Sequence, residues 1–289
     1  MTTQLKLTRI APTPSGFLHL GNVLSFAITA SLARETGAKI LLRIDDIDRA
    51  RATSPYLQDI FDTLNFLGVE WHQGPRNIAE FEENYSQLHR MHLYNAALTQ
   101  LAGNNLVYAC SCSRQQIQNS GGELASLCNC VNLHIPLKTE NVNWRLKTRL
   151  NDVLYIKDIN GTVTQAALPP DMHNFVIKKK DGFPAYQLTS VVDDLYYGVD
   201  LIVRGQDLWP STLAQQALAQ ALGTDKFKDI AFHHHPLLTE PSGKKLSKSA
   251  GAASIHHLRE SGKTAAEILA LAFRNAQYLR TTQGLPPGL

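Results

Sequence analysis

The chain has 289 residues, of which 44% are hydrophobic and 18% charged, proportions ordinary for a soluble globular protein. An apolar run of about 18 residues and a basic-then-apolar N-terminus are both absent, so we expect no membrane span, no secretory signal and a cytoplasmic protein. The net charge of +3 permits a polyanionic partner without requiring one.

The first elements alternate between strand and helix. Apolar residues between positions 5 and 10 predict a strand, and a helix of small residues is expected from 22 to 35. Residues 39–44 form a nearly continuous apolar run, which is typical of a buried parallel strand. Ser54 is the expected N-cap of the next helix, which should stop at Gly68. This alternation favours a doubly wound α/β domain.

The pattern changes near the middle of the chain. A long helix is expected from 81 to 102, and residues 110–170, with an Asn160-Gly161 hairpin turn, are expected to form a β-rich insertion. The α/β pattern then resumes, with a buried strand at 200–204 and a helix at 209–222.

The segment from Arg9 to Asn22 has the features of a phosphate site. A strand leads through a loop with Gly16 and Gly21 into a helix, whose N–H groups and dipole favour a nearby anion by roughly 0.3–1 kcal/mol. His19 stands at the helix start, where an imidazole can reach a phosphate oxygen. The same residues also fit an ordinary turn and helix cap.

A second segment, Lys245-Leu246-Ser247-Lys248-Ser249, lies in a loop that contains glycines. A short lysine cluster of this kind is either a solvated loop or a clamp for a polyphosphate. Lysine suits a leaving pyrophosphate because it is a compact charge on a flexible stem.

Together, the two segments resemble the His-Ile-Gly-His and Lys-Met-Ser-Lys-Ser signatures of class I aminoacyl-tRNA synthetases. The parts of the chain that narrow the resemblance to the glutamyl branch, and to the glutamyl-Q tRNA(Asp) synthetase family, are residues 9–21, 43–48, 186–194 and 203–212. This resemblance implies a Rossmann-like catalytic core, activation of glutamate by ATP as glutamyl-adenylate, and transfer of glutamate to the queuosine base of tRNA(Asp). It also implies Mg²⁺ with the ATP.

The resemblance further implies residue roles, with His19 and Lys248 as the catalytic pair. Glutamate would be bound by Arg9, Ala11, Thr13, Asp45, Tyr186 and Arg204. ATP would be bound by Pro12, Ser15, Gly16, His19, Gly21, Asn22, Lys245 and Lys248. Arg9 and Arg204 suit carboxylates because a planar guanidinium matches a carboxylate with two hydrogen bonds. Asp45 would meet the substrate ammonium.

Asp45, Tyr186 and the pair Arg43 and Asp46 each carry an alternative. The family has Glu where this chain has Asp45, a side chain shorter by one carbon or roughly 1.5 Å, so the backbone lies closer or a water bridges the gap. Arg43 and Asp46 can form a structural ion pair instead of lining a site. Tyr186 can belong to the core.

Four cysteines form two tight pairs, Cys110-x-Cys112 and Cys128-x-Cys130. Two such pairs brought together give a tetrahedral thiolate site, and we expect one structural zinc ion per chain, with free thiols as the alternative. The resembled family has a Tyr and one Cys where this chain has its second pair.

Two further clusters invite functional readings. Adjacent residues of a strand point to opposite faces, so we interpret His233-His234-His235 as a strand end before Pro236 and not as a metal site. Lys178-Lys179-Lys180 is interpreted as a solvated hairpin, with contact to RNA as the alternative.

The expected organisation is a catalytic domain in two halves, with an insertion and a C-terminal part. Its segments are residues 1–109 and 171–230 for the halves, 110–170 for the zinc-bearing insertion, and 231–289 for the lysine loop and a helical part. A monomer is expected. The alternatives are a shortened glutamyl-tRNA synthetase that charges the tRNA 3′ end and a non-catalytic paralogue that binds tRNA or an amino acid. About 40 residues follow the lysine loop, too few for another helical domain of usual size.

Overall fold

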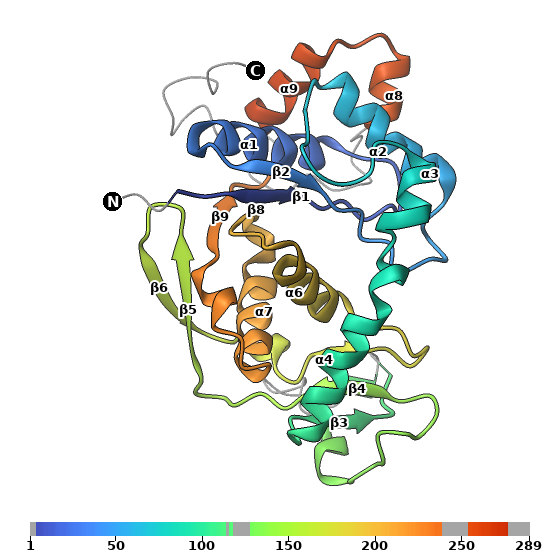
Figure 1. Cartoon of the computed structure of the whole chain (residues 1–289), viewed down its shortest axis with the longest axis vertical. Coiled ribbons are helices and arrows are strands. Elements are labelled where there is room, and N and C mark those ends of the chain that lie inside the picture. Colours follow the sequence, from blue (N-terminus) through green and yellow to red (C-terminus); the bar gives the residue numbers. More distant parts are fainter. Residues whose placement is uncertain (1–3, 114–115, 118–127, 239–253, 277–289) are drawn as a thin grey trace. The chain divides into compact units, whose positions relative to one another are not determined.

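The computed structural model describes residues 4–113, 116–117, 128–238 and 254–276, and divides into two compact units (Figure 1). Unit 1 comprises Met1–His89, Val199–Asp207 and Phe232–Leu289, and unit 2 comprises Arg90–Gly198 and Leu208–Ala231. These boundaries differ from those of the four segments expected from the sequence, and the division into four segments stays a prediction.

Unit 1 is built on parallel strands. Strands β2 (Lys39–Leu42), β1 (Leu7–Ile10), β8 (Leu201–Gly205) and β9 (Ala231–His235) follow one another in this order. β1 is parallel to both β2 and β8. All four residues of β1 are buried, as are three of the four in β2, which confirms that the apolar run at 39–44 contains a buried parallel strand.

Helix α1 (Leu20–Thr36) packs against these strands and against α9 (Ala265–Asn275) (Figure 1). α1 begins two residues before the expected Asn22 and ends at Gly37, whose φ of 75° is the left-handed conformation that glycine adopts most readily. Helix α2 (Ser54–Phe66) packs against α3 (Ile78–Glu80) and α8 (Ile255–Glu260). The predicted N-cap of α2 was wrong by one position, because Thr53 is the N-cap.

The long helix expected from 81 to 102 is broken. Residues Phe81–Tyr85 form a π-helical turn, Gln87–Arg90 form a 3₁₀ turn, and only α4 (Met91–Gly103) is α-helical. The cause is Asp46: its carboxylate accepts hydrogen bonds from Ser86 Oγ at 2.6 Å and from the backbone N–H of Gln87 at 2.7 Å. These long-range hydrogen bonds replace helical ones at the break.

Unit 2 contains a three-stranded antiparallel sheet with the order β3-β4-β7 and an antiparallel hairpin. The sheet strands are β3 (Val107–Cys110), β4 (Asn143–Leu146) and β7 (Val176–Lys178), and the hairpin strands are β5 (Val153–Asp158) and β6 (Val163–Ala167). Helix α6 (Tyr186–Tyr197) packs against α4 and α7 (Trp209–Ala221). The expected turn at Asn160-Gly161 and the expected helix over 209–222 are confirmed within one residue.

An ion pair buried in unit 2 joins α4 to α6. Arg90 donates from Nε and Nη2 to the two oxygens of Asp193, at 2.7 and 3.1 Å, and the Tyr94 hydroxyl donates to the same carboxylate at 2.7 Å. Asp193 is fully buried. Burial alone would lower the pKa of Arg90, but the partner carboxylate raises it, so both groups stay charged.

We expect Asp193→Asn to lower the free energy of unfolding by about 3 kcal/mol, because it leaves the Arg90 charge buried without a counter-charge. Urea unfolding measures this loss. Asp225→Asn is the matched control, because the Asp225 side chain is 89% exposed beside Lys228. Equal stability of the two variants would contradict the assigned importance of the buried pair.

Candidate functional site

The two arginines expected to bind carboxylates lie on neighbouring strands of unit 1. Arg9 is in β1 and Arg204 is in β8, and both side chains are buried, at 7% and 3% exposure. Arg9 Nη1 donates to the carbonyl of Val203 at 3.2 Å, so its guanidinium reaches the residue next to Arg204. The Arg204 guanidinium lies 5.2 Å from the centre of the Phe232 ring. The sheet therefore brings two buried positive charges together.

Asp45 lies three residues beyond the end of β2, beside the loop that follows β1. Its backbone N–H donates to the carbonyl of Pro12, and the N–H of Arg43 donates to Ile10, both at 2.9 Å. Arg43 then holds the Asp45 carboxylate by two hydrogen bonds, Nε to Oδ1 at 2.7 Å and Nη2 to Oδ2 at 3.1 Å. Asp45 is thus a fixed, buried carboxylate at the carboxyl ends of parallel strands, where open α/β sheets bind ligands.

The alternative in which Arg43 and Asp46 form an ion pair is wrong. Arg43 pairs with Asp45, whereas Asp46 pairs with Arg49 at 2.7 Å and holds the break near Ser86. Residues two apart in extended backbone share a face, and this spacing is the sequence signal that was missed.

The loop between β1 and α1 is anchored at its far end. The N–H of Leu18 donates to Asp59 of α2 at 2.8 Å, and the Leu18 carbonyl accepts from the N–H of Ile255. The Phe17 ring stacks on His256, with ring centres 4.6 Å apart. The predicted substrate residues Ala11, Thr13, Ser15 and Gly16 lie on this loop. Anchoring fixes where the loop meets the helix.

His19 is the N-cap of α1. Its Nδ1 accepts a hydrogen bond from the N–H of Gly21 at 3.1 Å, while the Asn22 side chain accepts from the N–H of His19 at 3.0 Å. A neutral imidazole that accepts at Nδ1 carries its proton on Nε2, so the ring presents a donor suited to a phosphate oxygen. The capping and phosphate interpretations are therefore compatible.

Gly21 fits closely against this ring. A Cβ at Gly21 would lie 2.9 Å from His19 Cε1 and 3.0 Å from Nδ1, so any larger residue would displace the imidazole. The absence of a side chain at Gly21 therefore leaves the space that the His19 ring occupies.

The remaining predicted residues fall into two groups. Lys245 and Lys248 lie outside the described residues. Tyr186 begins α6 in unit 2 and is 39% exposed, so the interpretation that it belongs to the core is wrong.

The three adjacent histidines end β9 before Pro236, as expected. His234 stacks on Phe232, and burial together with the nearby Arg204 charge lowers its pKa to about 4. Burial also lowers the pKa of His235. Within the described ranges, the histidines do not form a metal-binding group. His234 is thus kept as a neutral imidazole near Arg204.

The lowered pKa of His234 predicts a loss of stability in acid. Its pKa in the unfolded chain is about 6.5, so the contribution is present above that pH and is lost as pH falls toward 4. We expect His234→Gln to reduce the difference in unfolding free energy between pH 7 and pH 5 by about 1 kcal/mol, because partial exposure screens the charges. Urea titrations at both pH values measure it, with the exposed His257→Gln as control. The prediction fails if both variants keep the wild-type difference.

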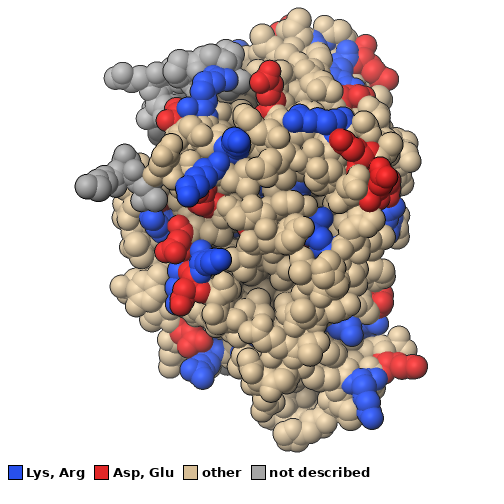
Figure 2. All heavy atoms as spheres, in the orientation of Figure 1, with Lys and Arg blue, Asp and Glu red and all other residues tan. Residues whose placement is uncertain are grey.

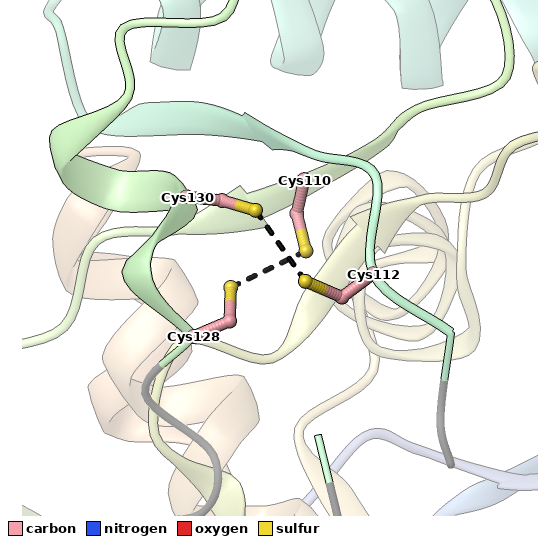
Figure 3. A group of neighbouring side chains, drawn as sticks. All are labelled: Cys110, Cys112, Cys128 and Cys130. Atoms are coloured by element: carbon pink, nitrogen blue, oxygen red, sulfur yellow. Dashed lines mark hydrogen bonds between the residues drawn. The ribbon is translucent and has the colours of Figure 1, made fainter. Parts of the chain in front are cut away.

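The four cysteines come together in unit 2, as the spacing predicted (Figure 3). Cys110 and Cys112 come from the end of β3, and Cys128 and Cys130 come from a 3₁₀ turn at Asn129–Asn132 and its N-cap. All four sulfur atoms lie within 4.8 Å of one another, with Cys110–Cys128 at 3.3 Å and Cys112–Cys130 at 3.5 Å. None of the four is in a disulfide.

This geometry fits a tetrahedral metal ion. A Zn–S bond of about 2.3 Å places sulfur atoms about 3.8 Å apart, within the range observed here. The pKa of Cys112 is raised to about 12, chiefly by burial, whereas hydrogen bonds with Cys112 and Ser111 overcome burial and lower that of Cys130 to about 7. Three buried sulfurs and a half-buried fourth could hold a metal ion such as zinc.

Comparisons with known proteins show the family of the chain. Residues 6–277 match the family model "tRNA synthetases class I (E and Q), catalytic domain". A glutamyl-Q tRNA(Asp) synthetase from Pseudomonas aeruginosa is 35% identical over 83% of this chain and 76% of its own length. One from Dechloromonas aromatica is 33% identical over 97% of this chain and 87% of its own length. A glutamate–tRNA ligase from Syntrophus aciditrophicus is 31% identical over 88% of this chain, which spans only 54% of that relative.

Solved structures show the same fold. The glutamate–tRNA synthetase of Elizabethkingia anophelis superposes with a TM-score of 0.69 at 24% identity, over 86% of this chain and 53% of that one. In the part of the chain that the structure describes, no helix is long and apolar enough to cross a membrane. The Rossmann-like class I fold expected from the sequence is confirmed, and the chain belongs to the class I tRNA synthetases of the E and Q group.

Proposed function

We propose that the protein activates glutamate with ATP as glutamyl-adenylate and transfers the glutamate to the queuosine base of tRNA(Asp). The observation that carries the activation step is the grouping of buried Arg9, Arg204 and Asp45 at the carboxyl ends of parallel strands. Glutamate has two carboxylates and one ammonium group, and two guanidiniums with one carboxylate complement these charges.

Arg43 would act as a positioning residue for the ammonium contact. Its two hydrogen bonds fix both oxygens of Asp45, which keeps the shorter carboxylate in one orientation. The backbone hydrogen bond from Asp45 to Pro12 ties this carboxylate to the start of the ATP loop. The pocket that results holds the amino acid beside the nucleotide.

The activation step is in-line attack of the glutamate α-carboxylate on the α-phosphorus of ATP. A carboxylate oxygen–phosphorus bond forms, the bond to the β-phosphate oxygen breaks, and pyrophosphate leaves. The chain's part is positioning and charge stabilisation. His19 would donate from Nε2 to a phosphate oxygen, and Lys248 would stabilise the leaving pyrophosphate. Mg²⁺ bound to the ATP would neutralise its phosphates. In the second step a nucleophile of the RNA attacks the acyl carbon and AMP leaves.

The cysteine cluster would hold one structural zinc ion. Four thiolates complete a tetrahedral coordination sphere, which leaves no position for a reactive water. The ion would join the end of β3 to the 3₁₀ turn across the segment between Cys112 and Cys128.

A second candidate is a shortened glutamyl-tRNA synthetase that charges the tRNA 3′ end. It is favoured by the similarity to glutamate–tRNA ligases, such as the one of Dehalococcoides mccartyi at 33% identity over 91% of this chain. Queuosine as the acceptor is favoured by the similarity to glutamyl-Q tRNA(Asp) synthetases, because this chain covers 76–87% of the length of those relatives.

The two candidates predict that labelled glutamate is attached to different nucleosides of the tRNA. The protein is incubated with labelled glutamate, ATP and tRNA(Asp), either with queuosine or with guanosine at that position. After nuclease digestion we expect label on the queuosine nucleoside and none with the guanosine form. Label on the 3′-terminal adenosine in both samples would support the second candidate and overturn the first.

A further inference from the structure

A groove with a basic lining lies in unit 2, away from the residues assigned to glutamate and ATP. We name it the lysine groove: it lies between residues 137–142 and residues 178–182, and Trp144 also lines it. Its volume is about 590 Å³. All of its residues belong to unit 2 and lie on or beside strands β4 and β7.

The aromatic wall of the groove is fixed in place. Trp144 Nε1 donates to the carbonyl of Leu137 at 2.9 Å, which holds the indole against the wall formed by residues 137–142. Trp144 and Lys178 are direct partners in the β4–β7 ladder, and the Lys178 ammonium lies 4.5 Å from the centre of the indole ring. A cation held against an aromatic face loses less side-chain entropy when it binds an anion.

The charge of the groove is positive. Four lysines line it, at positions 138, 178, 179 and 180, against two acidic residues, Glu140 and Asp181. Asp181 pairs with Lys179 at 2.8 Å, so that pair is neutral. Lys180 donates to the neutral carbonyl of Ser111 at 2.7 Å and keeps its full charge. Figure 2 shows basic and acidic side chains mixed on the face that it draws.

The combination of spaced ammonium groups with an indole is typical of surfaces that follow a nucleic-acid backbone. An open groove of this volume is larger than a single phosphate needs, and the lysines are spread along it. Lys180 also links the groove to Ser111, the residue between Cys110 and Cys112, so the metal site would stabilise one end of it.

We propose that the lysine groove binds the phosphate backbone of the RNA substrate, with Lys138, Lys178 and Lys180 as the contacts. This inference rests on the proposed function for its choice of RNA. It assigns no part in activating glutamate to these lysines, so the RNA contact and the chemistry are separable.

The test compares two triple variants of equal net charge. The groove variant carries Lys138→Gln, Lys178→Gln and Lys180→Gln, and the control carries Lys157→Gln, Lys226→Gln and Lys228→Gln elsewhere in unit 2. Binding of a fluorescein-labelled tRNA(Asp) transcript is measured by anisotropy over a range of salt concentrations. We expect the groove variant to bind at least about 10-fold more weakly and to lose about 2 from the slope of log K against log salt, since each phosphate contact contributes about 0.7–0.9.

Equal losses in the two triple variants, or no loss in the groove variant, would overturn the proposal. Melting temperature and zinc content are compared in all three proteins, so that misfolding is detected. Glutamate-dependent pyrophosphate exchange without tRNA should be unchanged in the groove variant. Absence of exchange in the unmodified protein would instead contradict the proposed function, and the binding result would still decide the role of the groove.

Discussion

Replacing Arg204 by alanine should lower glutamate-dependent exchange of pyrophosphate into ATP by about 10³-fold, equivalent to about 4 kcal/mol. Arg204 is 3% exposed in the strand next to Arg9, so its contact with a substrate carboxylate would be made away from water. Charged hydrogen bonds in such a setting are strong, and an unpaired carboxylate there is costly. The measurement is the initial exchange rate at several glutamate concentrations.

Arg204→Lys separates charge from geometry. It keeps the positive charge but loses the planar pair of donors, so we expect an intermediate loss of about 10²-fold. The KM for glutamate should rise in both variants while the KM for ATP changes little. Arg76→Ala is the matched control, because Arg76 is an exposed arginine of the same unit and its guanidinium lies 5.0 Å from the centre of the Trp71 ring. Rates in Arg204→Ala within threefold of that control would contradict the assigned role.

Replacing Cys128 by alanine should remove the metal from the protein. The wild type should contain about one zinc per chain, and the variant close to none, because three thiolates without the fourth hold structural zinc much more weakly. The melting temperature should fall as well, since binding of a structural metal contributes directly to folding free energy. Elemental analysis and thermal unfolding measure the two effects.

Ser113→Ala is the matched control for the cysteine substitution. Ser113 follows the first cysteine pair but offers no thiolate, so this variant should keep its zinc and lose little stability. Adding a strong chelator to the wild type should reproduce the lower melting temperature of Cys128→Ala. Wild-type protein that contains no metal, or one that melts at the same temperature with and without chelator, would contradict the zinc site.

The sequence was a good guide wherever local pattern decides structure. The apolar runs at 39–44 and 200–204 are buried parallel strands, and α2 ends just before Gly68, which takes the left-handed conformation at the predicted stop. The cysteine spacing was equally informative, because two closely spaced cysteine pairs in a small insertion favour a shared metal site. These features depend on neighbours in the chain, which a single sequence displays.

The failures come from contacts between distant residues. Apolar periodicity from 81 to 102 suggests one helix, but Asp46 draws Ser86 and Gln87 out of it. No local pattern predicts that a carboxylate 40 residues away will compete with helical hydrogen bonds. The choice of Asp45 over Asp46 as the partner of Arg43 is a different kind of miss, because residues two apart in extended backbone share a face and this spacing could have indicated it.

The loop before α1 contains one prediction that the structure confirms and one pair of alternatives that it reconciles. Its glycines and His19 correctly indicated a helix start, and the structure adds that Gly21 makes room for the imidazole and that Asn22 closes a capping box. The sequence suggested that capping and phosphate binding were alternatives. The position of His19 makes the two interpretations compatible, since an imidazole that caps through Nδ1 carries its proton on Nε2.

The most direct test of the account is exchange of labelled pyrophosphate into ATP, catalysed by the purified protein with Mg²⁺, without tRNA and with each amino acid in turn. Buried Arg9 and Arg204 with an Asp45 held by Arg43 predict exchange with glutamate and much slower exchange with aspartate, glutamine or any other amino acid. Absence of exchange with every amino acid, or exchange that prefers an amino acid other than glutamate, would contradict it.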